Sequence, residues 1–398
     1  MASRWIEEFE QFAVEVILDR RTGKRASLLR GVLWLLSGLF CRIVQTRIWL
    51  YKNRFFRPRS PGVLVLSVGN LTVGGTGKTP VVEFLARTLK EKGRQVAILS
   101  RGYKAKKPPL FRRLQRKWLG LVKHGTRVVH DGERLLLDSR FAGDEPFMLA
   151  RSLKNVVVLV DKDRVRAAAG AAREFGCDTL ILDDGMQYLP LHHRLEICLI
   201  DRQAPFGNEY LLPRGTLREP PENLARAQYI FITKSDGADN TALIERIRKY
   251  NRTAGIVECT HHPLHLTNLY TGEVLPLSWL PGKHIGAISG IARPESFEDK
   301  LVELGANLNL ASRFADHHRF TDKELGDFVN RCIRRDLDAI VTTEKDSVRF
   351  PYRPQTTEVP VLYLRVEIEI LRGHDVWEDL IGRICSPAEL CAPEPSFV

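Results

Sequence analysis

One glycine-rich segment, at 69–79, constrains the fold of this 398-residue chain more than any other part of the sequence. The apolar run before it, at 63–68, predicts a buried strand, and the pattern after it, at 80–91, predicts a helix. Between a strand and a helix, glycines let backbone N–H groups converge on an anion at the positive end of the helix. The segment therefore predicts a phosphate-binding loop in an α/β fold.

The end of this segment carries the residue types that bind a nucleoside triphosphate. Lys78 can reach the β and γ phosphates, and the hydroxyl of Thr79 can be a ligand for Mg²⁺. The usual spacing has glycine at position 72, where this chain has threonine, so a chance match to a shortened motif is the alternative. The predicted nucleotide-binding residues are Thr72, Val73, Gly74, Gly75, Thr76, Gly77, Lys78 and Thr79.

Two acidic pairs fit the same chemistry. An apolar run at 179–182 ends in Asp183 and Asp184, and an acidic strand end is where enzymes with this loop hold the metal or its water. Asp144 and Glu145 stand between a glycine and a proline at a predicted helix start, where the more frequent role of aspartate is a plain N-cap.

Two other clusters have a functional interpretation and a purely structural one. Asp316-His317-His318 combines a carboxylate with imidazoles, but a solvated loop explains the same residues. Thr233-Lys234-Ser235-Asp236 follows a predicted strand and resembles the guanine-reading tetrapeptide of GTPases. A capping turn is an equally good interpretation of these four residues.

Alternation of apolar runs with helical patterns predicts a parallel sheet flanked by helices, in the manner of P-loop NTPases, and a second, smaller α/β domain. Strands are expected at 63–68, 95–99, 156–160, 179–182, 196–200 and 229–233, and in the second unit at 285–289 and 339–342. The predicted domains are an N-terminal segment at 1–60, a P-loop domain at 61–265, a linker at 266–284, a smaller domain at 285–385 and a loose tail at 386–398.

The N-terminal segment combines apolar and basic residues. The chain carries 60 Lys and Arg against 48 Asp and Glu, a net charge of +12, and no acidic residue lies between Asp19 and Glu83. Within that stretch, apolar residues at helical spacing form one stripe, and the uncharged run at 31–41 is too short to span a bilayer. This pattern predicts a helix in the membrane interface, with a helix docked on the protein's own core as the alternative. The stripe consists of Leu28, Val32, Leu35, Leu36, Leu39 and Ile43.

Two further features bear on the setting. A basic tract at 101–127 is interpreted either as a solvated loop or as a flap that touches anionic lipid or substrate. The seven cysteines include no CxxC pair, which indicates a reducing, cytoplasmic environment.

Taken together, the motifs resemble the lipid A 4'-kinase (tetraacyldisaccharide 4'-kinase) family. The matching stretches occur in family order and cover most of the chain. The extra length of the phosphate loop makes the match more specific, and the family's loop also accounts for Thr72. The matching stretches lie at 67–80, 99–104, 143–146, 163–164, 182–185, 212–220, 289–297, 316–317 and 343–346.

The resemblance implies a kinase that uses ATP and Mg²⁺ to phosphorylate the 4'-hydroxyl of tetraacyldisaccharide 1-phosphate, giving lipid IVA. It implies a peripheral or monotopic enzyme on the cytoplasmic face of the bacterial inner membrane, in contact with anionic lipids. No nucleic acid and no obligate protein partner is expected.

The resemblance also implies roles for individual residues. Asp144 would be the catalytic base and His317 its partner. Thr79, Glu145, Asp183 and Asp184 would form the metal and nucleotide shell. Contacts to substrate or phosphates are expected from Arg101, Arg164, Gln187, Arg218 and Glu219.

This chain departs from the family pattern after the acidic strand end, where the usual Asp-Asp-Gly-Phe-Gln-His is replaced by a sequence with Met186 and Tyr188. Two other functions each explain part of the sequence. A membrane-associated NTPase of the partitioning or GTPase kind explains the loop but not Asp144 and His317. A nucleic-acid binder explains only the charge.

Overall fold

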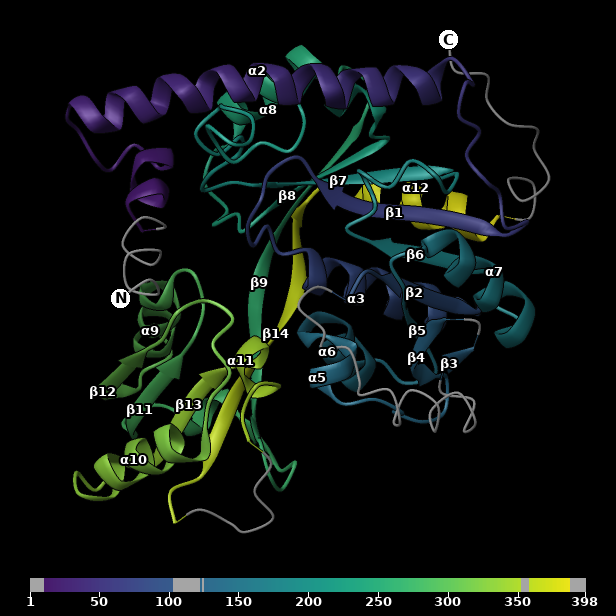
Figure 1. Cartoon of the computed structure of the whole chain (residues 1–398). Helices are drawn as coiled ribbons and strands as arrows, with labels where there is room; N and C mark the ends of the chain where they lie inside the picture. The colour runs from purple at the N-terminus through teal and green to yellow at the C-terminus, as the bar shows by residue number, and fades with distance from the viewer. Residues whose placement is uncertain (1–10, 103–121, 124, 352–357, 387–398) are drawn as a thin grey trace.

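The computed structural model describes residues 11–102, 122–123, 125–351 and 358–386, and its strands form one sheet shared by two lobes (Figure 1). Most of the basic tract at 101–127, nearly all of the tail at 386–398 and the first ten residues lie outside the described part. The centre of the larger lobe is parallel, in the order β8-β7-β1-β6-β2-β5. These strands are β1 (Leu64–Asn70), β2 (Val96–Ser100), β5 (Val157–Val160), β6 (Thr179–Asp183), β7 (Leu195–Asp201) and β8 (Tyr229–Thr233).

Helices cover both faces of this parallel sheet, which is why its strands are buried along their whole length and mainly apolar. Leu66 of β1 packs toward α3 (Lys78–Glu91), α6 (Asp144–Ser152) and α12 (His374–Cys385). Its neighbour Val65 packs on the opposite face, against α7 (Arg164–Phe175). A third cluster joins β7 and β8 to η1 (Pro221–Arg226) and α8 (Thr241–Tyr250). At the far edge, β4 (Thr126–Asp131) and β3 (Val122–Lys123) run antiparallel to their neighbours.

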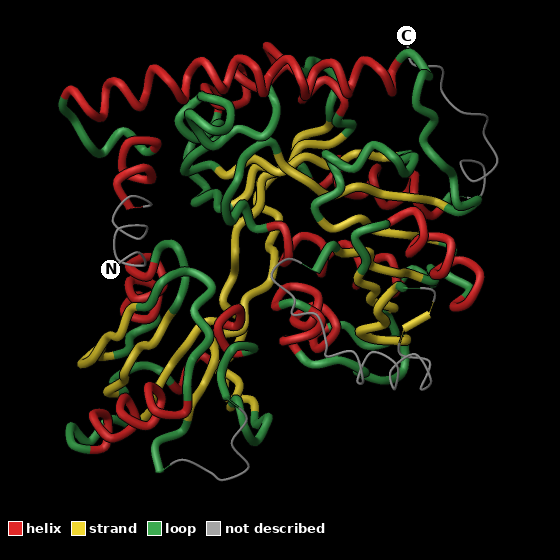
Figure 2. Tube along the Cα trace, in the orientation of Figure 1, coloured by secondary structure: helices red, strands yellow, loops and turns green. Residues whose placement is uncertain are grey.

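The smaller lobe repeats the α/β pattern on fewer strands. Its strands β11 (His284–Ser289), β12 (Asn307–Arg313) and β13 (Ala339–Thr343) are parallel. Its helices are α9 (Pro294–Glu303), α10 (Asp322–Ile333) and the short α11 (Glu344–Ser347). The predicted α/β fold with a second, smaller unit is therefore confirmed, and Figure 2 shows its helices and strands in the same view.

Two long antiparallel strands connect the lobes, and here the structure differs from the expected linker at 266–284. Strand β9 (Gly255–Asn268) pairs with β14 (Val361–Arg372) on both sides of Pro263, which has no N–H to donate. Beside this proline the register shifts, because Leu264 of β9 is skipped in the pairing. Within 266–284 the chain continues β9, then forms β10 (Val274–Pro276) and η2 (Leu277–Trp279). Local sequence favoured a break at the proline, and pairing with β14 overrides that preference.

The C-terminal helix belongs with the larger lobe, although the sequence assigns it to the smaller domain at 285–385. Trp377 of α12 stacks on Phe84 of α3, with ring centroids 4.7 Å apart, and meets Phe231 of β8 edge-on at 6.0 Å. Strand β14 carries the chain back across, so residues 374–385 complete the core beneath the phosphate loop.

The N-terminal helix α2 (Lys24–Lys52) lies along the outside of the larger lobe (Figure 1). Ser37 donates a hydrogen bond to the carbonyl of Leu211 (2.9 Å), and Gln45 to the side chain of Asn223 (3.4 Å). Every residue of the predicted apolar stripe is solvent-exposed, from 45% for Leu36 to 73% for Leu28. The stripe therefore does not pack on the core. The uncharged run of 31–41 alone is too short to span a bilayer, but the continuous 29-residue helix is long and apolar enough to cross a membrane.

A buried ionic cluster ties the helix after the phosphate loop to the smaller lobe. Arg365 of β14 donates to both Glu83 of α3 and Glu344 of α11, and all three residues are less than 10% exposed. Burial raises the pKa of Glu344, and the Arg365 charge offsets part of that effect. The guanidinium therefore holds two buried carboxylates together.

Replacing Arg365 with methionine is expected to lower the free energy of unfolding by about 3–5 kcal/mol, because it leaves two buried carboxylates facing each other. Urea denaturation followed by tryptophan fluorescence measures the change. Arg383→Met is the matched control, because its ion pair with Asp379 is exposed (3.3 Å) and is expected to contribute less than about 1 kcal/mol. Equal midpoints for the two variants would show that the cluster does not stabilise the fold.

Candidate active site

Side chains from β9 and from the end of β8 hold the phosphate loop in place. At its end, Gly77 has φ 79°, and a Cβ there would lie 3.1 Å from the ring of His261, so this position requires glycine. Thr233 donates to the carbonyl of Thr76 (2.8 Å), and the ammonium of Lys234 donates to the carbonyl of Gly75 (2.6 Å). With those carbonyls turned toward β8, the loop keeps the N-terminus of α3 open toward an anion.

Lys78 stands at the start of α3 among three predicted site residues. Its Nζ is 3.1 Å from Oδ1 of Asn70 and 3.6 Å from Oδ1 of Asp184. Arg218 donates to both carboxylate oxygens of Asp184 at 2.8 Å. Burial opposes ionisation of Asp184, but the positive charges of Lys78 and Arg218 outweigh it and lower its pKa. Gln187 joins the group by donating to the carbonyl of Asn70 (3.1 Å).

Asp183, at the end of β6, has a different environment. It is 2% exposed, and Ser100 donates to its Oδ2 at 3.0 Å. Its Oδ1 is buried and has no hydrogen-bond partner among the described residues. Burial, together with the charges of Glu145 and Asp184, raises its pKa to about 7. No ready-made group of three or more His, Cys, Asp or Glu ligands occurs in the described ranges.

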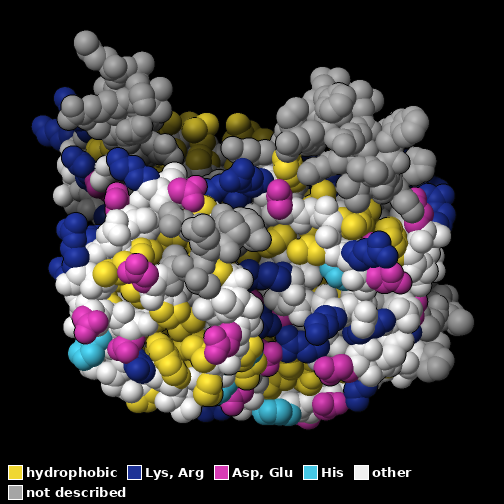
Figure 3. Space-filling model, turned by 90° about the horizontal axis from the view of Figure 1, so that it is seen from below, with side chains coloured by type: hydrophobic (Ala, Val, Ile, Leu, Met, Phe, Trp, Pro, Cys, Tyr) yellow, Lys and Arg dark blue, Asp and Glu magenta, His cyan; other side chains and the backbone are white. Residues whose placement is uncertain are grey.

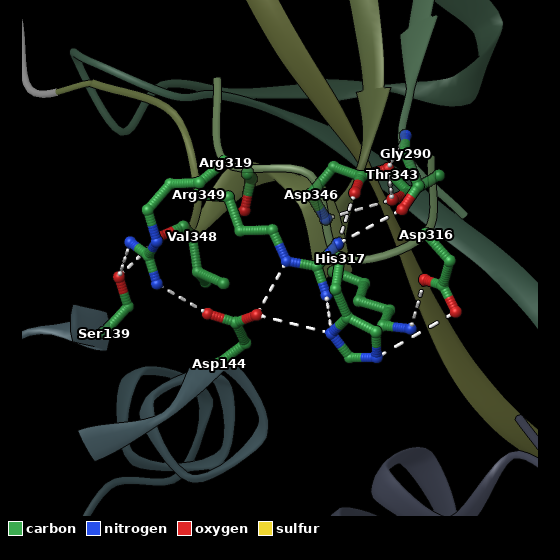
Figure 4. Close-up of polar contacts among 12 residues, drawn as sticks. Ser139, Asp144, Gly290, Asp316, His317, Arg319, Thr343, Asp346, Val348 and Arg349 are labelled. Carbon is green, nitrogen blue, oxygen red and sulfur yellow. Dashed lines mark hydrogen bonds and ion pairs between the residues drawn. The ribbon is translucent and has the colours of Figure 1, made fainter. Parts of the chain in front are cut away.

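Asp144 joins the two lobes (Figure 4). Gly143 is the N-cap of α6, so the expected alternative of a capping aspartate does not apply. The Asp144 side chain instead reaches across to the smaller lobe. There its Oδ1 accepts from Arg319 (2.9 Å) and its Oδ2 from Arg349 (2.7 Å), a side chain with no exposed surface.

The predicted pair of Asp144 and His317 is brought together both directly and through Arg349. Nδ1 of His317 lies 3.6 Å from Oδ2 of Asp144, and Nη2 of Arg349 is 2.9 Å from the same nitrogen. Nδ1 of His317 therefore lies between the guanidinium of Arg349 and the carboxylate of Asp144, on the opposite side of the ring from Nε2. That Nε2 faces a carboxylate oxygen of Asp316 at 3.9 Å.

These contacts make Asp144 less basic than an ordinary aspartate. Burial raises the pKa of its carboxyl, but His317, Arg349 and Arg319 more than offset burial and lower the pKa below its ordinary value. Asp144 is therefore ionised at neutral pH. In this form it can accept a proton or orient a hydroxyl.

The remaining predicted contact residues occupy different places. Arg164 is 7% exposed and stacks over the ring of Tyr188 at 4.1 Å; its Nε has no hydrogen-bond partner among described residues. Arg101 is exposed, and its charge acts on Arg164. Glu219 is 2% exposed and fully engaged with Asn223 and Arg226, both at 2.8 Å. Its observed contacts support the loop beneath α2 and do not include the phosphate loop.

Sequence reasoning missed the two arginines that hold Asp144. Both stand close to predicted motifs: Arg319 two residues after His317, and Arg349 three residues after Asp346. Arg349 also bonds Asp346 (2.8 Å) and the Gly290 carbonyl (3.2 Å), so with Asp144 and His317 it connects four of the matched motifs. The available signal was an arginine two or three residues after each of these motif residues.

Basic side chains and a pocket are two further features of the larger lobe and its surroundings. Seen from below, Lys and Arg side chains gather around the hollow between the two lobes (Figure 3). A pocket of about 390 Å³ lies between the end of α2 and the start of α7. Its lining includes Tyr51, Phe55, Arg57, Arg59 and Tyr188.

Comparisons with known proteins agree with one another. A family model described as tetraacyldisaccharide-1-P 4'-kinase matches residues 29–385. A tetraacyldisaccharide 4'-kinase of Anaeromyxobacter dehalogenans is 38% identical, over 90% of this chain and 91% of that protein. One from Desulfatibacillum aliphaticivorans is 36% identical, over 84% and 88%. The crystal structure of LpxK from Aquifex aeolicus in complex with ATP has a TM-score of 0.70 and 28% identity, covering 90% of this chain and all of that one.

Proposed function

This chain belongs to the tetraacyldisaccharide 4'-kinase family of lipid A biosynthesis, and from that premise we propose how its own residues carry out the transfer. The observation that carries the proposal is the placement of Asp144. It is joined to His317 of the smaller lobe through Arg349, and its neighbour Glu145 acts electrostatically on Asp183. The partitioning or GTPase alternative offers no role for this inter-lobe carboxylate.

We propose that ATP binds with its phosphates in the loop at 72–79, as the ATP complex of the Aquifex relative supports. Lys78 would exchange its contact with Asp184 for the β and γ phosphates. Arg218, freed in part from Asp184, would stabilise charge on the phosphoryl group in transit.

The residues present fit Mg²⁺. Carboxylate and hydroxyl oxygens are the ligands this ion prefers, and the buried, unpartnered Oδ1 of Asp183 is the strongest candidate. Thr79 at the start of α3, with Glu145 and Asp184 near Asp183, would complete the shell. Bound there, Mg²⁺ would neutralise charge on the transferring phosphates.

The acceptor sugar would approach from the pocket beside Tyr188. Aromatic rings of Tyr51 and Phe55 suit a sugar with acyl chains, and Arg57 and Arg59 suit its 1-phosphate. Asp144 would orient the 4'-hydroxyl and take its proton as the new P–O bond forms. Because phosphoryl transfer passes through a loose transition state, a weakly basic carboxylate suffices for this role.

Purified protein with ATP, Mg²⁺ and tetraacyldisaccharide 1-phosphate tests the proposal directly. We expect one phosphate to be transferred to the 4'-oxygen of the lipid, scored by mass spectrometry. ATP hydrolysis without a phosphorylated lipid would contradict it.

We propose that the enzyme sits on the cytoplasmic face of the inner membrane, with α2 in the interface. Contacts from the middle of α2 to Leu211 and Asn223 hold the helix along the protein body, which favours an interfacial over a spanning arrangement. ATP as substrate and the free thiols of the described cysteines fit the cytoplasmic side.

Replacing Leu35 and Leu39 with aspartate is expected to move the protein from the membrane to the soluble fraction and raise the apparent KM for the lipid. Both side chains are more than half exposed, so the fold should tolerate the change, whereas each lost apolar side chain removes about 1.5–3 kcal/mol of burial in lipid. Val302→Asp, on the exposed face of α9, is the control. Unchanged fractionation would rule out α2 as the anchor.

A further inference from the structure

The order of the strands in the sheet indicates which way a bound nucleotide would extend from the phosphate loop. The acids that face the transferred phosphate stand at the end of β6, on one side of β1, and β7 and β8 lie on its other side. A triphosphate seated in the loop with its γ phosphate toward Asp183 therefore extends its nucleoside toward the ends of β7 and β8. This step rests on the proposed function.

The segment found there is Thr233-Lys234-Ser235-Asp236, which the sequence left as either a GTPase-like tetrapeptide or a capping turn. Its first two side chains bond the loop carbonyls of Thr76 and Gly75, so the segment is joined to the phosphate site. Lys234 has φ 55°, and its ammonium also pairs with Asp201 at the end of β7 (2.5 Å). These contacts are more than a local turn requires.

The last residue, Asp236, is paired in a way that changes what it can bind. Its Oδ2 accepts from Nη1 of Arg202 (2.7 Å), and its Oδ1 accepts from the backbone N–H of Ala238 (3.0 Å). Arg202 is itself fixed by Asn240, whose Oδ1 accepts from its Nε at 2.6 Å. The Asp236 side chain remains 61% exposed, so a ligand can reach it, but its charge is neutralised.

Guanine and adenine present different hydrogen-bonding groups to a carboxylate on their Watson–Crick edges. Guanine presents two donors, N1–H and the 2-amino group, which a free carboxylate accepts together. Adenine presents a lone pair at N1, which a free carboxylate repels. We propose that Thr233–Asp236 and Arg202 form the subsite for the purine base of the nucleotide, and that the Arg202–Asp236 ion pair sets its preference for adenine over guanine.

The test is competitive binding of ATP and GTP against a fluorescent ATP analogue, on the full-length protein in detergent without lipid. Arg202→Gln frees the Asp236 carboxylate, and the ratio of GTP to ATP affinity should rise about ten-fold or more, the effect of one or two charge-assisted hydrogen bonds. Adding Asp236→Asn to that variant should remove the gain. Arg246→Gln is the matched control, because its exposed pair with Glu209 (2.8 Å) lies outside the proposed subsite.

A ratio within two-fold of the wild type in Arg202→Gln would overturn the inference while leaving ATP binding intact. A wild-type protein that bound neither nucleotide would instead overturn the proposed function at the phosphate loop, and the inference with it. Photolabelling of the wild type with 8-azido-ATP gives a second readout that needs no variant. Label on the peptides around 201–203 or 233–240 supports the subsite, and label confined to the smaller lobe contradicts it.

Discussion

Replacing Lys78 with alanine is expected to abolish phosphate transfer, with a loss of at least about 10³-fold, and to weaken ATP binding sharply. The ammonium stands at the N-terminus of α3, between Asn70 and Asp184, and is the cation that the β and γ phosphates would meet first. Its removal leaves Asp184 near the phosphates with one positive partner fewer. Initial rates of lipid phosphorylation and equilibrium binding of ATP measure the two effects.

Lys90→Ala is the matched control, because Lys90 lies in the last turn of the same helix, where its exposed ammonium bonds Gln95 (3.0 Å). That variant should keep wild-type turnover. Near-wild-type turnover in Lys78→Ala would contradict the kinase mechanism.

The parts of the fold that sequence alone predicted are those where local pattern and tertiary environment agree. Strands β1, β2, β6, β7 and β8 are buried on both faces, so most of their residues are apolar and the run is visible in the sequence. The loop and the acidic strand end follow from the same strands. Predicted and observed strand limits differ by at most about two residues, the usual uncertainty of an element's ends.

Long-range pairing explains what the sequence did not predict. Strand β9 contains exposed and polar residues and a proline, and it forms because β14, about a hundred residues later, pairs along nearly its whole length. The same return of the chain places α12 in the larger lobe. The local sequence contains no signal for the pairing of β9 with β14 or for the placement of α12.

In the candidate site, too, local motifs predicted some residues, whereas others depend on contacts between distant parts of the chain. Motif resemblance identified Asp144 and His317, which the fold brings within 3.6 Å from opposite lobes. It could not identify Arg349 as the group between them, because the role of this arginine depends on its burial and on the crossing of two lobes. Glu219 illustrates the reverse case, since its place in a matched motif suggested a substrate contact and its buried pair with Arg226 indicates support of a loop.

Replacing Asp144 with asparagine is expected to lower kcat by about 10²–10⁴, the range for a positioned base, with modest change in ATP affinity. The amide keeps the shape of the carboxylate but cannot take the proton of the 4'-hydroxyl. It also loses the charge that holds Arg319 and Arg349. Steady-state kinetics at saturating lipid measure the loss, and urea denaturation shows whether the lobes still hold together.

The relation between Asp144 and His317 is tested by their double variant. His317→Ala removes the acceptor of one Arg349 hydrogen bond, so the guanidinium that orients Asp144 becomes less constrained and kcat should also fall. If the two residues act through the same arginine, the double variant loses much less than the product of the two single losses. His318→Ala is the control, because its imidazole faces Glu324 at 3.1 Å instead of Asp144. Fully multiplicative losses would show that Asp144 and His317 act independently, and that the contact through Arg349 has no part in catalysis.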